Sequence, residues 1–114
     1  MTLQEREARA CAIIDSMTEE LRDISLYLHD NPELGLNEHK AVKVINQFLE
    51  NHNFISQVGL TDYPELQTAL RGDYNGTAQH KIAFLGEYDA LPELGHGCGH
   101  NLIAMMSLGA AIAF

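Results

Sequence analysis

Three side chains that bind soft transition metals lie within five residues, in a loop rich in glycine. His96, Cys98 and His100 alternate with glycines in the segment 95–101. Neutral imidazole and thiolate are the preferred protein ligands of zinc and related ions. In an extended backbone this spacing would direct all three side chains roughly the same way. A catalytic zinc needs about three protein ligands and one open position. The spacing therefore favours a metal site over a glycine-rich turn whose histidines bond the backbone.

Two carboxylates precede this loop at the end of an apolar run. Glu87 and Asp89 are two residues apart, so they share one face of an extended segment. Either could orient a ligating histidine by accepting a hydrogen bond from its other ring nitrogen, or could ligate directly. The alternative is a solvated strand end, which is common for acidic residues. The position of the pair just before the loop favours the functional interpretation.

The elements that must position these residues are predicted from hydrophobic spacing. Apolar residues from Cys11 to Leu28 recur every three or four positions. This pattern predicts one long helix that ends before Pro32 and that places Cys11 in the core. A second amphipathic helix is predicted over 41–49, with Asn37 as its N-cap.

The second half of the chain changes to short apolar runs. Strands are predicted over 54–58, 66–71 and 81–86, with a turn at Asn75-Gly76 before the last of them. The run at 81–86 is almost continuously apolar, which is typical of a strand covered on both faces in an α/β sheet. Ligands bind at the carboxyl ends of strands in open α/β sheets, and the two carboxylates follow such an end.

The last predicted helix, over 102–114, is apolar almost all round, and Asn101 is its predicted N-cap. A helix that is apolar on every side must be buried on every side. Little of the preceding chain can cover it, so the sequence predicts covering segments beyond Phe114.

Composition excludes several classes of protein. The 114 residues carry 16 Asp and Glu against 7 Lys and Arg, which gives a net charge of −9. There is no basic patch, so neither nucleic acid nor a membrane surface is expected as a partner. The N-terminus has no apolar signal core, and two distant cysteines do not form a disulfide framework. A cytoplasmic location is therefore expected.

Two motifs together resemble the M20 metallopeptidase/amidohydrolase family. They are the segment 86–92, Gly-Glu-Tyr-Asp-Ala-Leu-Pro, and the segment 95–101, Gly-His-Gly-Cys-Gly-His-Asn. The best match is the branch of aminobenzoyl-glutamate hydrolases, N-acyl-amino-acid amidohydrolases and M20-domain dipeptidases. The stretch 29–35, together with Glu38, is similar to the N-terminal signature of that family. The resemblance runs from about Ser25 to Phe114.

The resemblance implies an α/β fold. Residues 1–114 would form the N-terminal portion of an α/β/α zinc-peptidase-like catalytic domain, with two amphipathic helices, then strands, then a buried helix. The remainder of that domain and a smaller lid domain would lie outside these residues. The lid domain often dimerises, which would allow a homodimer of the full enzyme.

Site residues are carried over from the family by position. Cys98 and His100 match its metal ligands, and Asp89 matches the aspartate that supports the metal centre. His96 belongs to the motif but is not usually counted as a ligand. Related aminoacylase-type members have a histidine ligand where this chain has Glu87, so metal contact by Glu87 or His96 stays open. The implied cofactor is two divalent ions; zinc is favoured by the cysteine ligand, and manganese is the alternative.

The implied activity is hydrolysis of an amide bond in small N-acyl amino acids or dipeptides, by a metal-activated water and a glutamate base. That glutamate and the later metal-binding histidines have no counterpart in residues 1–114. We therefore expect this chain alone to be an inactive part of a parent enzyme. The alternative is a non-enzymatic metal-binding or interaction fragment with a vestigial site. A structural zinc module ranks last, because it needs a fourth ligand.

Overall fold

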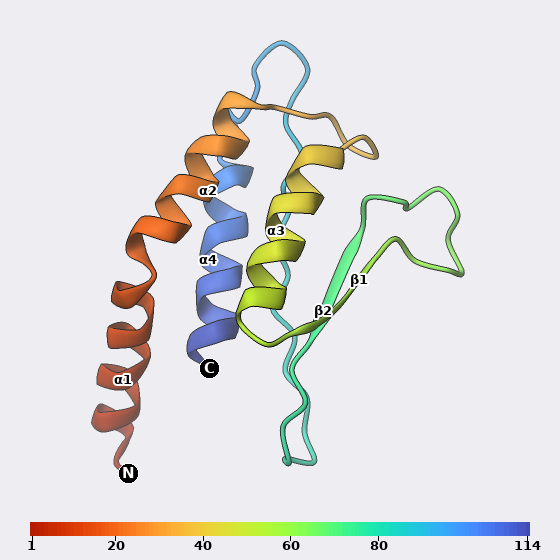
Figure 1. Cartoon of the computed structure of the whole chain (residues 1–114). Helices are drawn as coiled ribbons and strands as arrows, with labels where there is room; N and C mark the ends of the chain where they lie inside the picture. Colours follow the sequence, from red (N-terminus) through yellow and green to blue (C-terminus); the bar gives the residue numbers. More distant parts are fainter.

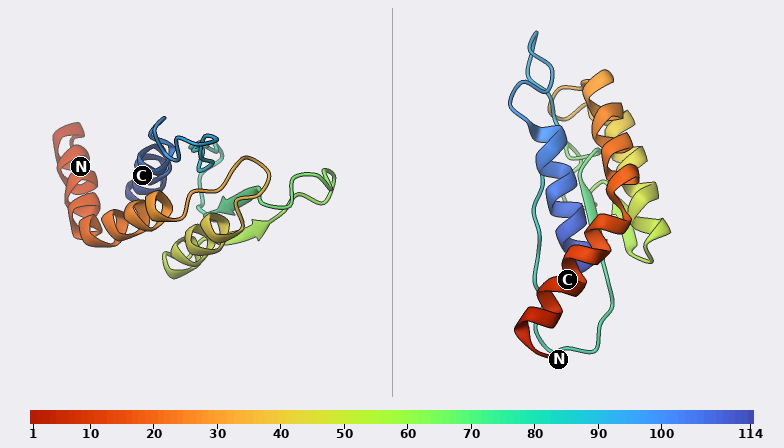
Figure 2. Two further views of the ribbon diagram at one scale, coloured as in Figure 1. Left: turned by 90° about the horizontal axis from the view of Figure 1, so that it is seen from above. Right: turned by 90° about the vertical axis from the view of Figure 1, so that its left-hand side faces the viewer.

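The computed structural model describes residues 1–114 as four helices and one two-stranded antiparallel sheet. Helices α2 and α4 lie side by side, and α3 packs on the sheet (Figure 1; Figure 2). The fold is thus a mixed α and β domain, which confirms the combination of helices and strands that the expected α/β class implies. In chain order the elements are α1 (Leu3–Ser16), α2 (Thr18–Asp30), α3 (His39–Asn51), β1 (Ile55–Val58), β2 (Leu70–Asp73) and α4 (His100–Ala113).

The long first helix expected from the sequence is two helices with a bend at Met17. The hydroxyl of Ser16 donates to the carbonyl of Ile13 at 2.6 Å, and that of Thr18 donates to Asp15 at 2.9 Å. Side-chain bonds to preceding carbonyls compete with the helical backbone and bend helices. The expectation of one continuous helix is therefore wrong.

Beyond the bend, only the end of α1 reaches the core, where Ile13 packs against its edge. No residue of α1 is buried, and Cys11 is exposed, so the expectation of a buried Cys11 is also wrong. Met17 itself is buried, which anchors the start of α2. The end of this helical region is confirmed: α2 ends at Asp30, two residues before Pro32. None of the four helices has the length and apolar content that crossing a membrane requires.

The core lies where α2, α3 and α4 approach one another. Phe48 and Leu28 are its most deeply buried large side chains. Burying a side chain of this kind contributes about 1.5–3 kcal/mol relative to leaving it exposed. The predicted helix over 41–49 is confirmed, since α3 supplies four of the nine core residues. The other members of the core are Met17, Ile24, Ala41, Ile45, Leu49, Ala104 and Met105.

The sheet pairs β1 with β2, and Ile55 lies opposite Asp73 while Val58 lies opposite Leu70. The strand expected at 54–58 is confirmed, whereas the one expected at 66–71 begins only at Leu70. The residues before it form turns instead. The amide of Leu66, for example, donates to the carbonyl of Tyr63 at 2.9 Å.

Residues 81–86, predicted as a strand covered on both faces, are extended but pair with no strand. Leu85 is 85% exposed and Ile82 is 60% exposed, so this prediction is wrong for the chain as described. The segment runs beside α4, where the hydroxyl of Ser107 donates to the carbonyl of Leu85. Gly86 comes so close to α4 that an added Cβ would lie 3.0 Å from the Cβ of Ser107.

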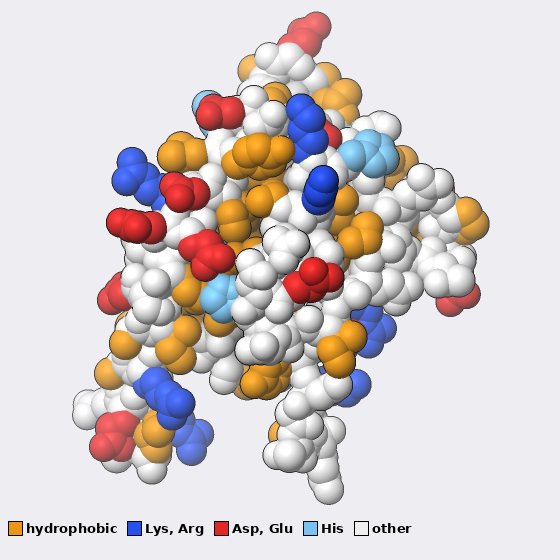
Figure 3. Space-filling view, in the orientation of Figure 1, with side chains coloured by type: hydrophobic (Ala, Val, Ile, Leu, Met, Phe, Trp, Pro, Cys, Tyr) orange, Lys and Arg blue, Asp and Glu red, His pale blue; other side chains and the backbone are white.

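Helix α4 is buried on one side only. Ala104 and Met105 belong to the core, whereas Leu102 is 58% exposed and Met106 is 72% exposed. The predicted burial on every side is therefore wrong for residues 1–114. Apolar side chains of α4 are consequently exposed. On the face that Figure 3 shows, hydrophobic side chains gather near the middle, with charged side chains around them.

The N-terminus of α4 is capped by Gly99, not by Asn101 as predicted. Gly99 has a φ of 83°, in the left-handed region that glycine adopts without a steric penalty. Asn101 lies inside the first turn and is buried. Its amide donates to the carbonyl and the hydroxyl of Ser25 at 3.3 and 3.2 Å, which joins α4 to α2.

Candidate metal centre

The two stretches that carry the family resemblance meet at one end of the molecule, where α2 ends and α3 and α4 begin (Figure 1). The amide of Ala90 donates to the carbonyl of Glu33 at 2.7 Å, and Leu34 forms a parallel bridge with Ala90. A Cβ added to Gly95 would lie 3.7 Å from the Cβ of Pro32. Segments far apart in the sequence thus form one surface.

Glu33 connects this surface to α3. Its carboxylate accepts from the backbone amides of Lys40, at 2.9 and 3.0 Å, and of Ala41, at 2.8 Å. These amides belong to the first turn of α3, where no helical partner exists. The cap expected from Asn37 is not formed: the N-cap residue is Glu38, which makes no side-chain cap bond of its own.

Asp89 and His100 form a direct pair. The Nδ1 atom of His100 lies 2.8 Å from Oδ1 of Asp89 and 3.0 Å from its backbone carbonyl oxygen. Both partners are acceptors, so Nδ1 carries the proton and donates. A neutral His100 consequently keeps its lone pair on Nε2. A carboxylate that orients a histidine through its second nitrogen is the usual support of a metal-bound imidazole.

The glycine-spaced loop does not place its three candidate ligands together. Gly95 and Gly99 both have left-handed φ values, of 57° and 83°, and the loop turns at each. His96 is buried, whereas Cys98 is exposed. The expected extended backbone, with all three side chains on one side, is therefore wrong.

His96 points into the protein and not toward solvent. It is 8% exposed, and its Nδ1 atom is buried without a hydrogen-bond partner. Burial lowers the pKa of His96, and the nearby imidazoles of His100 and His29 lower it further. The carboxylate of Asp89 and, to a smaller extent, the backbone of Leu28 in the last turn of α2 oppose this lowering of the pKa. The burial of its ring thus favours a neutral His96.

The donors present fit part of a divalent-metal site. His100 offers an oriented Nε2 lone pair, and Cys98 offers an accessible sulfur two residues away. No group of three or more His, Cys, Asp and Glu side chains is arranged to hold an ion. Glu87 is exposed. Further ligands are needed to complete a tetrahedral centre with an open position.

A polar network beside this site is a feature that the sequence does not predict. The hydroxyl of Tyr88 donates to the carbonyl of Thr68, and the hydroxyl of Thr68 donates to the carboxylate of Glu38. The sequence alone assigns no role to Thr68. No local spacing could have revealed the network, because its three members come from three distant segments.

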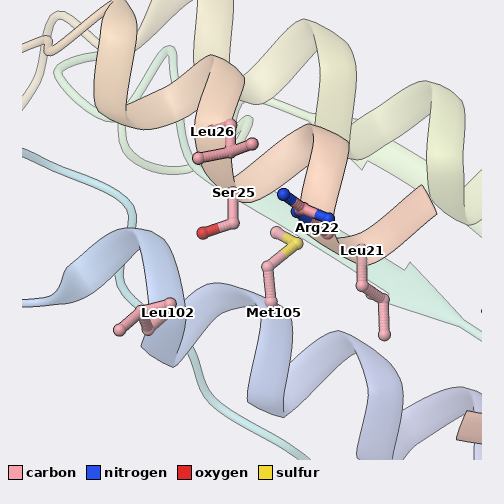
Figure 4. A pocket seen from close by; sticks show the side chains of 6 residues that line it. All are labelled: Leu21, Arg22, Ser25, Leu26, Leu102 and Met105. Carbon is pink, nitrogen blue, oxygen red and sulfur yellow. The ribbon is translucent and has the colours of Figure 1, made fainter. Parts of the chain in front are cut away.

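An apolar groove lies apart from the candidate metal ligands. It lies between α2 and α4, has a volume of about 350 Å³ and includes Leu21, Leu26 and Leu102 (Figure 4). Arg22 is the only ionisable side chain that lines it. The groove therefore offers no acid, base or metal ligand for hydrolysis.

Comparisons with known proteins agree with the resemblance carried by the motifs. The chain is 37% identical to the Xaa-Arg dipeptidase of Mus musculus over 110 residues, and 34% identical to that of Homo sapiens over 113. It is 30% identical over 117 residues to one of the subunits of the p-aminobenzoyl-glutamate hydrolase of Escherichia coli (strain K12). These matches cover 91%, 91% and 88% of the chain. No protein-family model matches it.

The relatives are peptidases and hydrolases, which defines the class to which the chain is related. More particularly, the chain is homologous to the Xaa-Arg dipeptidases and to p-aminobenzoyl-glutamate hydrolase, which are M20-like hydrolases. The family expected from the motifs is confirmed. The matched region spans about a quarter of the length of these relatives, at 26%, 26% and 24%.

Proposed function

We propose that these residues form part of a metal-dependent hydrolase that cleaves amide bonds in small N-acyl amino acids or dipeptides. The single observation that carries the proposal is the Asp89–His100 pair, which leaves Nε2 of His100 free as a ligand. Homology to a dipeptidase and to an aminobenzoyl-glutamate hydrolase supports a small peptide or acyl amino acid as substrate.

In this proposal Cys98 and His100 hold a divalent ion, and zinc is favoured because a thiolate is among the ligands. When bound, the ion supplies Lewis-acid chemistry that activates water and polarises the scissile carbonyl. Asp89 keeps the proton of His100 on Nδ1 and fixes the direction of the ring. The backbone bond between Ala90 and Glu33 holds the end of the segment before the glycine-rich loop against the loop that follows α2.

Further parts of the proposal follow the family. The parent enzyme would hold two ions and would take its general base and remaining ligands from other residues. Residues 1–114 would form the N-terminal portion of its α/β/α catalytic domain, in the cytoplasm, with a lid domain through which a homodimer would form. The 114-residue chain alone would hydrolyse no dipeptide.

Cobalt titration of the 114-residue chain tests the metal ligands. Co²⁺ bound by a thiolate gives a ligand-to-metal charge-transfer band, which we expect in the native chain and in the Cys11→Ser variant. Cys11 is a matched control, since both cysteines are free and exposed. The band should be lost in Cys98→Ser and weakened in His100→Gln, with His80→Gln as the exposed histidine control.

The outcomes separate the proposal from its alternative. A band that survives Cys98→Ser but not Cys11→Ser would exclude the proposed ligand pair. Metal-dependent dipeptide hydrolysis by the 114-residue chain, abolished by Cys98→Ser, would contradict its expected inactivity. If no cobalt binds even at a large molar excess over the chain, the alternative is favoured, which is a non-enzymatic fragment with a vestigial site.

A further inference from the structure

Tyr88 is the residue next to Asp89, and it is anchored away from the metal ligands. Its hydroxyl donates to the backbone carbonyl of Thr68, which lies twenty residues earlier. Burial raises the pKa of Tyr88 to about 12, and the carboxylate of Glu38 raises it as well. A phenol that stays protonated in this setting remains a hydrogen-bond donor across the ordinary pH range.

Thr68 connects Tyr88 to α3 through a second hydrogen bond. Its hydroxyl donates to one carboxylate oxygen of Glu38, while the amide of Leu36 donates to the other oxygen at 3.0 Å. Thr68 is 4% exposed, so its polar groups are removed from solvent. Buried polar groups that are fully paired make a local structure rigid. Tyr88 is thereby connected to the N-cap residue of α3.

The bond between Tyr88 and Thr68 also sets the direction in which the side chain of Asp89 points. Successive side chains of an extended segment point to opposite faces. With Tyr88 held toward Thr68, Asp89 is directed to the other face, where His100 lies. The following residue, Ala90, is held independently by its amide bond to Glu33 at 2.7 Å. Asp89 is thus fixed on both sides, and both supports lead to the first turn of α3.

We propose that Tyr88, acting through Thr68 and Glu38, is a positioning residue that aims the carboxylate of Asp89 at Nδ1 of His100. The relevance of this role to catalysis rests on the proposed metal-dependent function. The geometric claim does not, because it concerns hydrogen bonds within the metal-free chain. Loss of the phenol hydroxyl would release the segment from Thr68 and weaken the bond that holds the proton of His100 on Nδ1.

The test reads the tautomer of His100 directly. Long-range proton–nitrogen NMR of the metal-free 114-residue chain distinguishes Nδ1–H from Nε2–H imidazole. It is recorded at about pH 8.5, above the usual histidine pKa of about 6.5. The native chain should show His100 as Nδ1–H, since the hydrogen bond made by the ring sets its tautomer. Tyr88→Phe should convert it to a mixture in which Nε2–H predominates.

Control variants distinguish a specific loss of the orientation of Asp89 from a general loss of stability. Tyr74→Phe removes a hydroxyl from an exposed tyrosine whose ring contacts Phe54, and it should leave the tautomer unchanged. Val44→Ala weakens packing at the edge of the core without touching the network. Its loss of thermal stability provides the comparison for Tyr88→Phe. Even if Val44→Ala loses as much thermal stability as Tyr88→Phe, or more, its His100 should remain in the Nδ1–H form.

A second variant keeps the proposal testable if Tyr88→Phe does not fold. Thr68→Val removes the hydroxyl that reaches Glu38 but keeps the backbone carbonyl, so it should shift the tautomer partially, whereas Thr68→Ser should not. Full retention of Nδ1–H in Tyr88→Phe, or an equal shift in Val44→Ala, would overturn the proposal. Neither result depends on whether cobalt binds, so this proposal and the proposed function can fail separately.

Discussion

The Nδ1 atom of His100 donates to the carboxylate of Asp89 at 2.8 Å and to its carbonyl at 3.0 Å. The two residues come together because Asp89 ends an extended segment and His100 begins α4, with the intervening loop turning back on itself. Within that loop, Leu91 and Gly95 exchange backbone hydrogen bonds of 2.8 and 3.1 Å. The pair is the part of the candidate centre that residues 1–114 assemble.

The contact between Gly86 and α4 should not tolerate a methyl group. A Cβ at Gly86 would lie 3.0 Å from both the Cβ and the Oγ of Ser107 and 3.4 Å from the Cα of Ala104. We expect Gly86→Ala to lower the free energy of unfolding by about 1–3 kcal/mol, the usual cost of an overpacked contact. Urea denaturation measures the difference. Gly76→Ala is the matched control, because nothing lies within 4 Å of its added Cβ; an equal loss there would contradict the packing argument.

Glu33 should stabilise α3 as a cap supplied from outside the helix. Its carboxylate accepts from the amides of Lys40 and Ala41. We expect Glu33→Ala to lower the free energy of unfolding by about 0.5–2 kcal/mol, the range for loss of an N-terminal cap. Glu33→Gln should retain part of that stability, because its amide oxygen still accepts. Glu65→Ala, at an exposed site, should stay within about 0.5 kcal/mol of the native chain. Equal effects at both glutamates would rule out a specific cap.

The buried bond between Asn101 and Ser25 should couple α4 to α2. Removing one partner leaves the other unsatisfied, so Asn101→Ala should cost about 1–3 kcal/mol of stability. Adding Ser25→Ala should cost less than the sum of the single changes. A double-mutant cycle in chemical denaturation measures the coupling, which we expect at about 0.5–3 kcal/mol. Simple additivity would mean that the contact contributes nothing specific.

Alkaline pH should destabilise the chain through Tyr88. Burial raises the pKa of this phenol to about 12, so the folded state favours the protonated form. The resulting stabilisation is complete below the ordinary tyrosine pKa of about 10 and is lost as the pH rises from there to about 12. Ultraviolet difference titration should show an ionisation step near pH 12. Tyr88→Phe should remove that step and Tyr74→Phe should keep it; the reverse would contradict the assignment.

The spacing of apolar residues and the turn-forming residues predict those elements that nearby residues determine. The apolar spacing of α3, the end of α2 before Pro32 and the strand at 55–58 all follow from nearby residues. The bend at Met17 escapes this kind of prediction, because hydroxyl bonds from Ser16 and Thr18 outweigh a continuous apolar stripe. Cys11 is exposed for the same reason, since the helix beyond the bend has no buried residue.

Features that depend on distant contacts could not be predicted from local pattern. An apolar run such as 81–86 indicates a strand, but whether it pairs depends on a neighbour that residues 1–114 do not supply. The directions of His96 and Cys98 depend on turns at Gly95 and Gly99, not on alternation along an extended chain. The network around Tyr88 depends on contacts across the fold. The motifs indicate the family correctly, whereas the hydrogen bonds of the site require the structure.

The most direct test of the candidate centre is a zinc titration followed by long-range proton–nitrogen NMR of all six histidines. We predict that Zn²⁺ shifts the Nε2 resonance of His100 while its Nδ1–H proton remains bonded to Asp89, and that His96 and the exposed His80 do not shift. Asp89→Asn should weaken this binding, since the amide accepts the hydrogen bond less strongly than the carboxylate. Zinc bound through Nδ1 of His100, or a shift confined to other histidines, would contradict the account.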